Sequence, residues 1–152
     1  MNKNVLIVIG LSCISIIVIF ICFVGGVTST YPPIRQYGYL GTTSQLVTDI
    51  RKYTLVDSDI TFKITDTTGS EKNGYAIYMQ IEAKNIEYNL LCEEQGADIG
   101  KTTVNLVGVY DKIQNIGGYS KEAKDIDLLV SKFASTVLKP LKDTQNIQIT
   151  PL

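Results

Sequence analysis

The hydrophobic pattern of the chain begins with a largely apolar block, residues 5–24, which are twenty consecutive positions without a charge, interrupted only by the small residues Ser12, Cys13 and Ser15. A helix rises about 1.5 Å per residue, so this block is long enough to cross the roughly 30 Å hydrocarbon core of a bilayer. We predict a transmembrane signal-anchor helix over residues 1–26. Two alternatives stay open: a signal peptide cleaved within the small-residue cluster 25–29, and a lipoprotein that carries its lipid on Cys13.

The charges around this block predict its orientation in the membrane. Lys3 precedes the block, and the next charged residue along the chain is Arg35. Positive residues favour the cytoplasmic side of a membrane. We therefore expect a single-pass protein with a cytoplasmic N-terminus and an extracytoplasmic domain.

The segment that follows, residues 27–42, comes directly after Gly25-Gly26 and contains Gly38, Gly41 and the pair Pro32-Pro33. Two adjacent prolines favour an extended backbone, and glycines interrupt regular structure. We expect a linker here. Tyr31 is close enough to the apolar block to reach the headgroup level, whereas Tyr37 and Tyr39 are expected to pack on the domain.

Polar and apolar residues alternate with a period of two in the middle of the chain, which is typical of half-buried β-strands. Ile60, Phe62 and Ile64, for example, alternate with polar neighbours. At Lys84-Asn85 the apolar positions change from odd to even numbers, which indicates a bulge or, as we favour here, a tight turn. The expected strands are 60–65, 75–83, 86–93 and 102–112, with a candidate edge strand at 145–150.

Apolar positions with helical spacing flank these strands on both sides. A short helix is expected over residues 44–54, with Thr43 or Ser44 as its N-cap. A longer amphipathic helix is expected over residues 121–139, with Ser120 as its cap.

Pro140 is expected to end this longer helix or to kink it. The order of elements predicts an α+β fold, in which an N-terminal transmembrane helix is followed by a small antiparallel sheet of three to five strands packed against the long C-terminal helix. We expect residues 43–152 to form a single domain.

Composition narrows the chemistry that this domain can perform. The chain contains no histidine, which excludes Ser-His and Cys-His catalysis and most zinc or copper sites. Cys13 and Cys22 lie in the apolar block, so Cys92 is alone in the domain and is expected to be a small buried hydrophobe. The 14 Lys and Arg residues are matched by 15 Asp and Glu residues without a basic cluster, so nucleic acid is not an expected partner.

Two short motifs look like ligand sites but lack the full pattern. Residues 96–102 (GADIGKT) resemble a phosphate-binding loop, yet three residues instead of four separate the glycines, and a strand is expected to follow instead of a helix. The acidic pairs Asp57/Asp59 and Glu93/Glu94 offer too few ligands for calcium. We expect no cofactor and no bound metal.

Tyrosines on the expected strands either pack within the sheet, as aromatic residues of a sheet ordinarily do, or form a surface for a protein partner. Tyr78, Tyr88 and Tyr110 are the candidate residues, because tyrosine is enriched at the centres of interfaces. The function we expect is that of a membrane-anchored, non-enzymatic protein whose domain binds another protein as an accessory or assembly subunit of a membrane complex. Two alternatives stay open: a domain that holds a small apolar ligand or a lipid between the sheet and the long helix, and an atypical Ser-Lys hydrolase.

Overall fold

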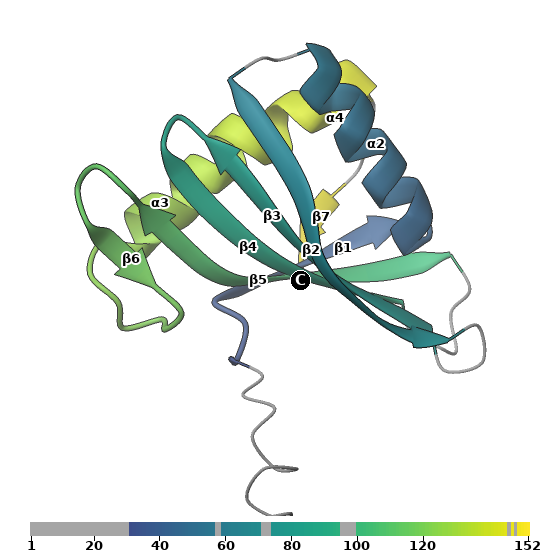
Figure 1. Ribbon diagram of the computed structural model, residues 1–152, viewed down its shortest axis with the longest axis horizontal. Coiled ribbons are helices and arrows are strands. Elements are labelled where there is room, and N and C mark those ends of the chain that lie inside the picture. The colour runs from purple at the N-terminus through teal and green to yellow at the C-terminus, as the bar shows by residue number, and fades with distance from the viewer. Residues whose placement is uncertain (1–30, 57–58, 71–73, 95–99, 146, 148) are drawn as a thin grey trace, which may run out of the picture. The chain divides into compact units, whose positions relative to one another are not determined.

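A single antiparallel sheet forms the body of the domain in the computed structural model, which describes residues 31–152 except 57–58, 71–73, 95–99, 146 and 148. Figure 1 shows the sheet strongly twisted, with the helices gathered on one of its faces. The strands are β1 (Arg35–Leu40), β2 (Ile60–Ser70), β3 (Gly74–Ala83), β4 (Ile86–Glu94), β5 (Lys101–Asp111), β6 (Ile116–Gly118) and β7 (Ile149–Pro151). The helices are α2 (Thr43–Val56), α3 (Ile126–Phe133), the π-helical turn η1 (Ala134–Leu138) and α4 (Lys139–Gln145).

The strands lie in the order β2-β3-β4-β5-β1-β7, and β6 pairs with β5. The predicted α+β class with an antiparallel sheet and a C-terminal helix is confirmed. The predicted count of three to five strands is wrong, because the sheet has seven. The strands that were not predicted, β1 and β6, are six and three residues long and contain glycine, so they show no clear alternation. β7 overlaps the candidate edge strand at 145–150 and does lie at an edge of the sheet.

Strand β1 lies inside the segment that was expected to be a linker. Arg35–Leu40 pairs along its whole length with β5, from Arg35 opposite Leu106 to Leu40 opposite Lys101. The expectation of no regular structure is therefore wrong for these residues, since pairing with a central strand outweighs the local effect of Gly38. Tyr37 and Tyr39 are buried on this strand, as expected.

The predicted anchor, residues 1–26, lies outside the described residues. Within the part of the chain that the structure does describe, no helix combines the length and the apolar character needed to cross a membrane.

A tight turn joins β3 to β4, as predicted from the change of apolar positions from odd to even numbers at Lys84-Asn85. Lys84 and Asn85 both have positive φ, of 50° and 67°, and they join Ala83 directly to Ile86. Two central residues in this conformation make the type I′ turn of a two-residue hairpin. As a result, odd-numbered residues of β3 and even-numbered residues of β4 face the same side of the sheet.

Helix α2 covers the range expected for the first helix, but another residue caps it. The Thr42 amide donates to Gln45 Oε1 at 2.9 Å, and the Gln45 amide donates to Thr42 Oγ1 at 3.2 Å, which is a capping box. Thr43 instead donates both its amide and its hydroxyl to Glu94 Oε1, at 2.9 and 2.8 Å. This carboxylate at the end of β4 therefore lies at the N-terminus of α2, where negative charge is favoured.

The C-terminal helix begins later and runs further than expected. It starts at Ile126 instead of residue 121, and Ser120 lies outside it, hydrogen-bonded to Glu122. Pro140 does not end the helix, because the turn before it widens to a π-helix and α4 continues to Gln145. A proline cannot donate to the carbonyl four residues earlier, and a π-turn accommodates that gap.

The core lies between the sheet and this helical layer. Phe133 of α3 packs against two tyrosines, with ring-centroid distances of 5.7 Å to Tyr37 and 4.9 Å to Tyr88. The largest fully buried side chains are Tyr88, Phe133, Leu46, Met79, Ile81, Leu106, Leu129, Leu141, Val104, Val109, Val137 and Thr43.

Cys92 is fully buried on the helix-facing side of β4, as the sequence predicts. Burial, with a smaller effect from the charge of Glu93, raises the pKa of its thiol to about 12. A thiol that is kept protonated in the interior is a poor nucleophile. This residue is therefore structural, and its labelling reports on unfolding.

We expect alkaline pH to destabilise the domain. An exposed thiol ionises near about 8.5, so between that pH and about 12 the unfolded chain releases a proton that folded Cys92 keeps. Burial, with the hydrogen bond to Asp49, also raises the pKa of Tyr39 to about 12, and burial raises the pKa of Tyr37 and Tyr88. The unfolded state thus binds fewer protons over this range, and the free energy of unfolding falls as pH rises from about 9 to 12.

Urea titrations at several pH values check this expectation, with Cys92 labelling as the readout in a chain that carries Cys13→Ser and Cys22→Ser. At pH 8 and without urea, Cys92 is expected to label far more slowly than a free thiol. Rapid native-state labelling, or a free energy of unfolding that stays constant up to pH 12, would contradict the burial of these groups.

Candidate partner surface on the open sheet face

The two faces of the sheet differ in what covers them. The helices lie against the face that carries the buried rows of β3 and β4, while among the described residues no helix lies on the opposite face (Figure 1). We call this opposite side the open face. Its residues are the even-numbered positions of β3 and their cross-strand partners, and most of them are half-buried or exposed.

One row across the open face places an aromatic ring beside an aliphatic side chain. Tyr78 of β3 pairs with Leu91 of β4, which pairs with Asn105 of β5. Asn105 is buried, and it donates to Glu93 Oε2 at 2.8 Å and accepts from Gln36 Nε2 at 2.9 Å. The buried Asn105 amide is therefore satisfied on both its oxygen and its nitrogen, and it lies next to Leu91, which is 9% exposed, and one strand further from the half-buried Tyr78.

A second aromatic group lies over the centre of β5. Tyr119 rests on Gly108, where an added Cβ would lie 2.5 Å from the ring. Only glycine permits this close approach. Tyr31 stacks on Tyr119 with a ring-centroid distance of 4.9 Å, and Asn89 Nδ2 donates to the Tyr119 hydroxyl at 3.3 Å.

Charged residues line one side of this group. Lys112 Nζ donates to Glu82 Oε2 at 2.6 Å and lies 3.4 Å from Glu87 Oε2. The hydrogen bond to Glu82 raises the pKa of this exposed lysine. Tyr110, opposite Glu87, is 36% exposed and hydrogen-bonds through its hydroxyl to Asn115.

The structure does not bring the three predicted tyrosines together. Tyr88 is 0% exposed and faces the helices, so it cannot belong to an exposed surface. The reason is the parity change at the β3–β4 turn, which sends even-numbered residues of the two strands to opposite faces. Tyr78 and Tyr110 do share the open face, four positions and two strands apart, which corresponds to roughly 16 Å from ideal sheet spacings.

Three residues join them there that the sequence did not single out for this surface. Leu91 is the cross-strand partner of Tyr78 and is 9% exposed. Tyr119, stacked with Tyr31, lies over Gly108, in a row between those of Tyr78 and Tyr110. We refer to these five side chains as the tyrosine patch: Tyr31, Tyr78, Leu91, Tyr110 and Tyr119.

No protein-family model, curated protein or solved structure matches this chain in the comparisons with known proteins.

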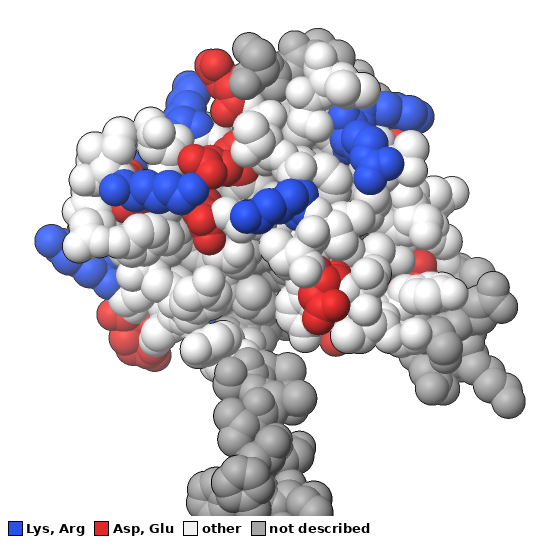
Figure 2. Space-filling view, viewed as in Figure 1, with Lys and Arg blue, Asp and Glu red and all other residues white. Residues whose placement is uncertain are grey.

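The charge pattern of the surface favours no single sign. Figure 2 shows acidic and basic side chains interspersed among uncharged ones over the face in view. An evenly mixed surface gives no electrostatic reason to attract a polyanion.

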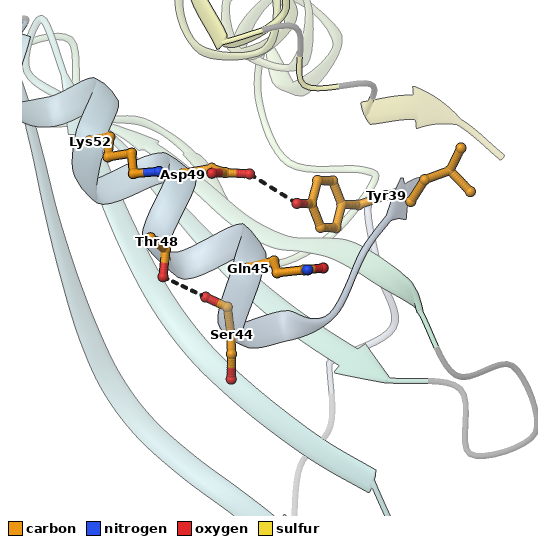
Figure 3. Close-up of a pocket in the computed structure, with 7 residues that line it drawn as sticks. Tyr39, Ser44, Gln45, Thr48, Asp49 and Lys52 are labelled. Carbon is orange, nitrogen blue, oxygen red and sulfur yellow. Dashed lines mark hydrogen bonds between the residues drawn. The ribbon is translucent and has the colours of Figure 1, made fainter.

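A hollow of about 500 Å³ lies beside β1 and α2, away from the tyrosine patch. Figure 3 shows Tyr39 pointing across it toward Asp49, with Gln45 and Lys52 projecting from the same helix. The Tyr39 hydroxyl donates to Asp49 Oδ2 at 3.0 Å. This contact joins β1 to α2, so we interpret the Tyr39–Asp49 pair as structural.

Two of the described hollows are lined by both a serine and a lysine, the pair that a Ser-Lys hydrolase needs. Ser44 and Lys52 line the hollow beside α2, and both are exposed on the surface of that helix. Lys84 and Ser135 both line a hollow of about 260 Å³ beside η1. Lys84 is exposed, whereas a lysine that acts as a base is desolvated, and Ser135 Oγ donates to the Lys132 carbonyl at 3.1 Å. The described geometry therefore gives neither pair a catalytic arrangement.

The two motifs that only partly match ligand sites are described in part. Glu94 faces α2, while Glu93 accepts from Asn105 on the open face, so the two carboxylates do not converge. In the motif at 96–102, residues 96–99 lie outside the described residues, and Lys101 begins strand β5. Asp57 of the other acidic pair also lies outside the described residues. Among the described residues, no three metal-ligating side chains cluster.

The space between the sheet and the C-terminal helix is filled by side chains. Leu129, Phe133 and Val137 enter it from the helix and Tyr88, Leu106 and Val109 from the sheet, each at most 1% exposed. This packing does not favour the alternative of a lipid held in that space.

Proposed function

We propose that this chain is a membrane-anchored, non-enzymatic protein whose extracytoplasmic domain binds another protein through the tyrosine patch. In this proposal the domain serves as an accessory or assembly subunit of a membrane complex. The observation that carries it is the open face, which no described helix covers and which gathers four tyrosines and a leucine.

The composition of the patch supports binding of a protein. Tyrosine is enriched at interface centres, because its ring buries a large apolar area while its hydroxyl keeps a polar partner. The hydroxyls of Tyr119 and Tyr110 already hydrogen-bond within the domain, to Asn89 and Asn115. A docking protein therefore need not supply hydrogen bonds to these two hydroxyls. The surrounding polar groups provide the polar rim that interfaces usually have.

The membrane tether in this proposal is the apolar block at residues 5–24. After a carbonate wash, we expect the full-length chain to stay in the membrane fraction. Release of a mature chain that starts beyond Gly26 would contradict the tether and leave the partner surface to be tested separately.

The partner surface is tested by purifying the full-length chain from its native membrane in a mild detergent. We expect the wild type to bring down one protein in stoichiometric amount and the Tyr78→Lys variant to lose it, because a lysine puts a hydrated charge into the patch. Tyr75→Lys is the matched control. Tyr75 lies on the same strand and is 39% exposed, but as an odd-numbered residue of β3 it faces the other side of the sheet.

Recovery of the chain alone under all gentle conditions would contradict the proposal. So would a co-purifying protein that Tyr78→Lys retains as well as the wild type does.

A further inference from the structure

Strand β2 ends the sheet on one side, and its outer edge pairs with no strand among the described residues. It is 11 residues long, whereas β7 at the other end of the sheet has three. A long free edge carries a row of unpaired backbone groups that can pair with another strand. Natural proteins usually shorten such edges or cover them.

Half of this strand is exposed on both sides of the sheet. Every residue from 63 to 69 is exposed, including Ile64 at 40%. The residues here are rich in threonine and contain no proline, so every one of them has the backbone N–H that pairing needs, with one bulge between Ile64 and Asp66. Figure 1 shows this end of the β2–β3 hairpin extending past the helices.

The charges of β2 are self-complementary. Its only charged residues are Lys63 and Asp66, and neither forms an ion pair among the described residues. Lys63 pairs with Gln80 and Asp66 with Tyr78, so both lie on the open face, and the bulge between Ile64 and Asp66 keeps them there. When two copies of β2 run antiparallel in the appropriate register, Lys63 of each copy lies directly opposite Asp66 of the other.

This register also matches the remaining residues. Phe62 then lies opposite Thr67 of the second copy. Both residues belong to the helix-facing side of the sheet, because they pair with Ile81 and Ile77 of β3. Charged residues on an edge strand normally discourage pairing with foreign strands. In this arrangement the same two residues attract, because directly opposed side chains of opposite charge stabilise a strand pair.

We propose that β2 pairs with β2 of a second copy of this chain across a two-fold axis near Ile64 and Thr65. The two sheets then form one continuous sheet, and the interface is isologous. The proposal does not rest on the proposed function, since edge-to-edge pairing leaves the tyrosine patch of each copy uncovered.

Charge reversal tests the proposal on the full-length chain in mild detergent, with the oligomeric state measured by light scattering across a range of concentrations. Lys63→Glu and Asp66→Lys each place like charges opposite one another at two points. We expect each to weaken self-association about tenfold. The double variant restores both attractive pairs and is expected to recover wild-type association.

Lys142→Glu is the control, because it reverses an exposed charge on α4. Unchanged Cys92 protection confirms that each variant is folded. A monomeric wild type would overturn the proposal, and so would association that both single reversals leave unchanged, which would place the contact elsewhere in the chain.

A disulfide test checks the register independently, in chains that carry Cys13→Ser and Cys22→Ser. A chain with Lys63→Cys is co-expressed with a chain carrying Asp66→Cys, and we expect a cross-linked pair between the two. Either chain alone is expected to give little cross-link. In a pair of identical chains, the new thiols of the two copies are not opposite one another but lie three residues out of register. Equal cross-linking in all three preparations, or none in the mixed one, would contradict this pairing.

Discussion

Replacing Phe133 with alanine is expected to lower the free energy of unfolding by about 3–5 kcal/mol, the largest loss at a single core position. The ring is 1% exposed and is enclosed by Tyr37 on β1 and Tyr88 on β4. Its removal leaves a cavity and also forfeits two aromatic contacts, worth about 0.5–1.5 kcal/mol each. Since domains are stable by about 5–15 kcal/mol, this variant is expected to be only marginally folded.

The measurement is a urea titration followed by pulsed labelling of Cys92, in the background lacking the other two cysteines. Leu128→Ala is the matched control, because Leu128 lies on the same helix but is 52% exposed. We expect that control to change the free energy of unfolding by no more than about 0.5 kcal/mol. Similar losses for both variants would show that Phe133 does not hold the sheet and helix together.

Gly117→Ala is expected to cost about 2–4 kcal/mol, through a clash that no side chain can relieve. Gly117 has a φ of +99°, and an added Cβ would lie 2.2 Å from the Val109 carbonyl oxygen and 2.8 Å from Leu129 Cδ1. The first contact is with backbone of the central strand, so β6 itself must move away from β5. This movement would also shift the loop that carries Tyr119 onto the open face.

Gly100→Ala separates the clash from the backbone strain. Gly100 has nearly the same φ, +97°, but an added Cβ there meets nothing within 4 Å. We expect Gly100→Ala to cost about 1 kcal/mol, which is the strain of a left-handed conformation alone. If the two variants lose the same free energy of unfolding, the close packing of β6 on β5 is not as described here.

Long elements with a clear period could be predicted from the sequence, and short ones could not. β3 and the first part of β4 alternate and β5 is a long apolar run, so the existence and nearly the bounds of these three strands follow from the pattern. β2 is predicted only to residue 65, because the polar residues that follow it are typical of a turn, whereas the strand continues to Ser70. β1 forms because β5 provides a partner strand along its whole length. The residues around Gly38 contain no local sequence pattern from which this pairing could be predicted. The C-terminal helix shows a similar effect, because a π-turn precedes Pro140 and the helix continues to Gln145, although the local rule allows it to end at the proline.

The candidate surface could be predicted in part, and its error has a definite cause. The parity change at Lys84-Asn85 was recognised, and it already implies that Tyr78 and Tyr88 face opposite sides. Tyr88 could therefore have been excluded from the sequence alone. Tyr119 and Tyr31 could not have been found in this way, because they reach the open face from outside the strands, across Gly108.

The central claim is that the open face is where a partner protein docks, and site-specific photo-crosslinking in native membranes tests it most directly. A photoreactive amino acid is placed at Tyr78, at Tyr110 or, as the control on the helix layer, at Leu128. The account predicts a cross-link to the same protein from positions 78 and 110 and none from position 128. Cross-links from position 128 alone, or none from positions 78 and 110, would contradict it.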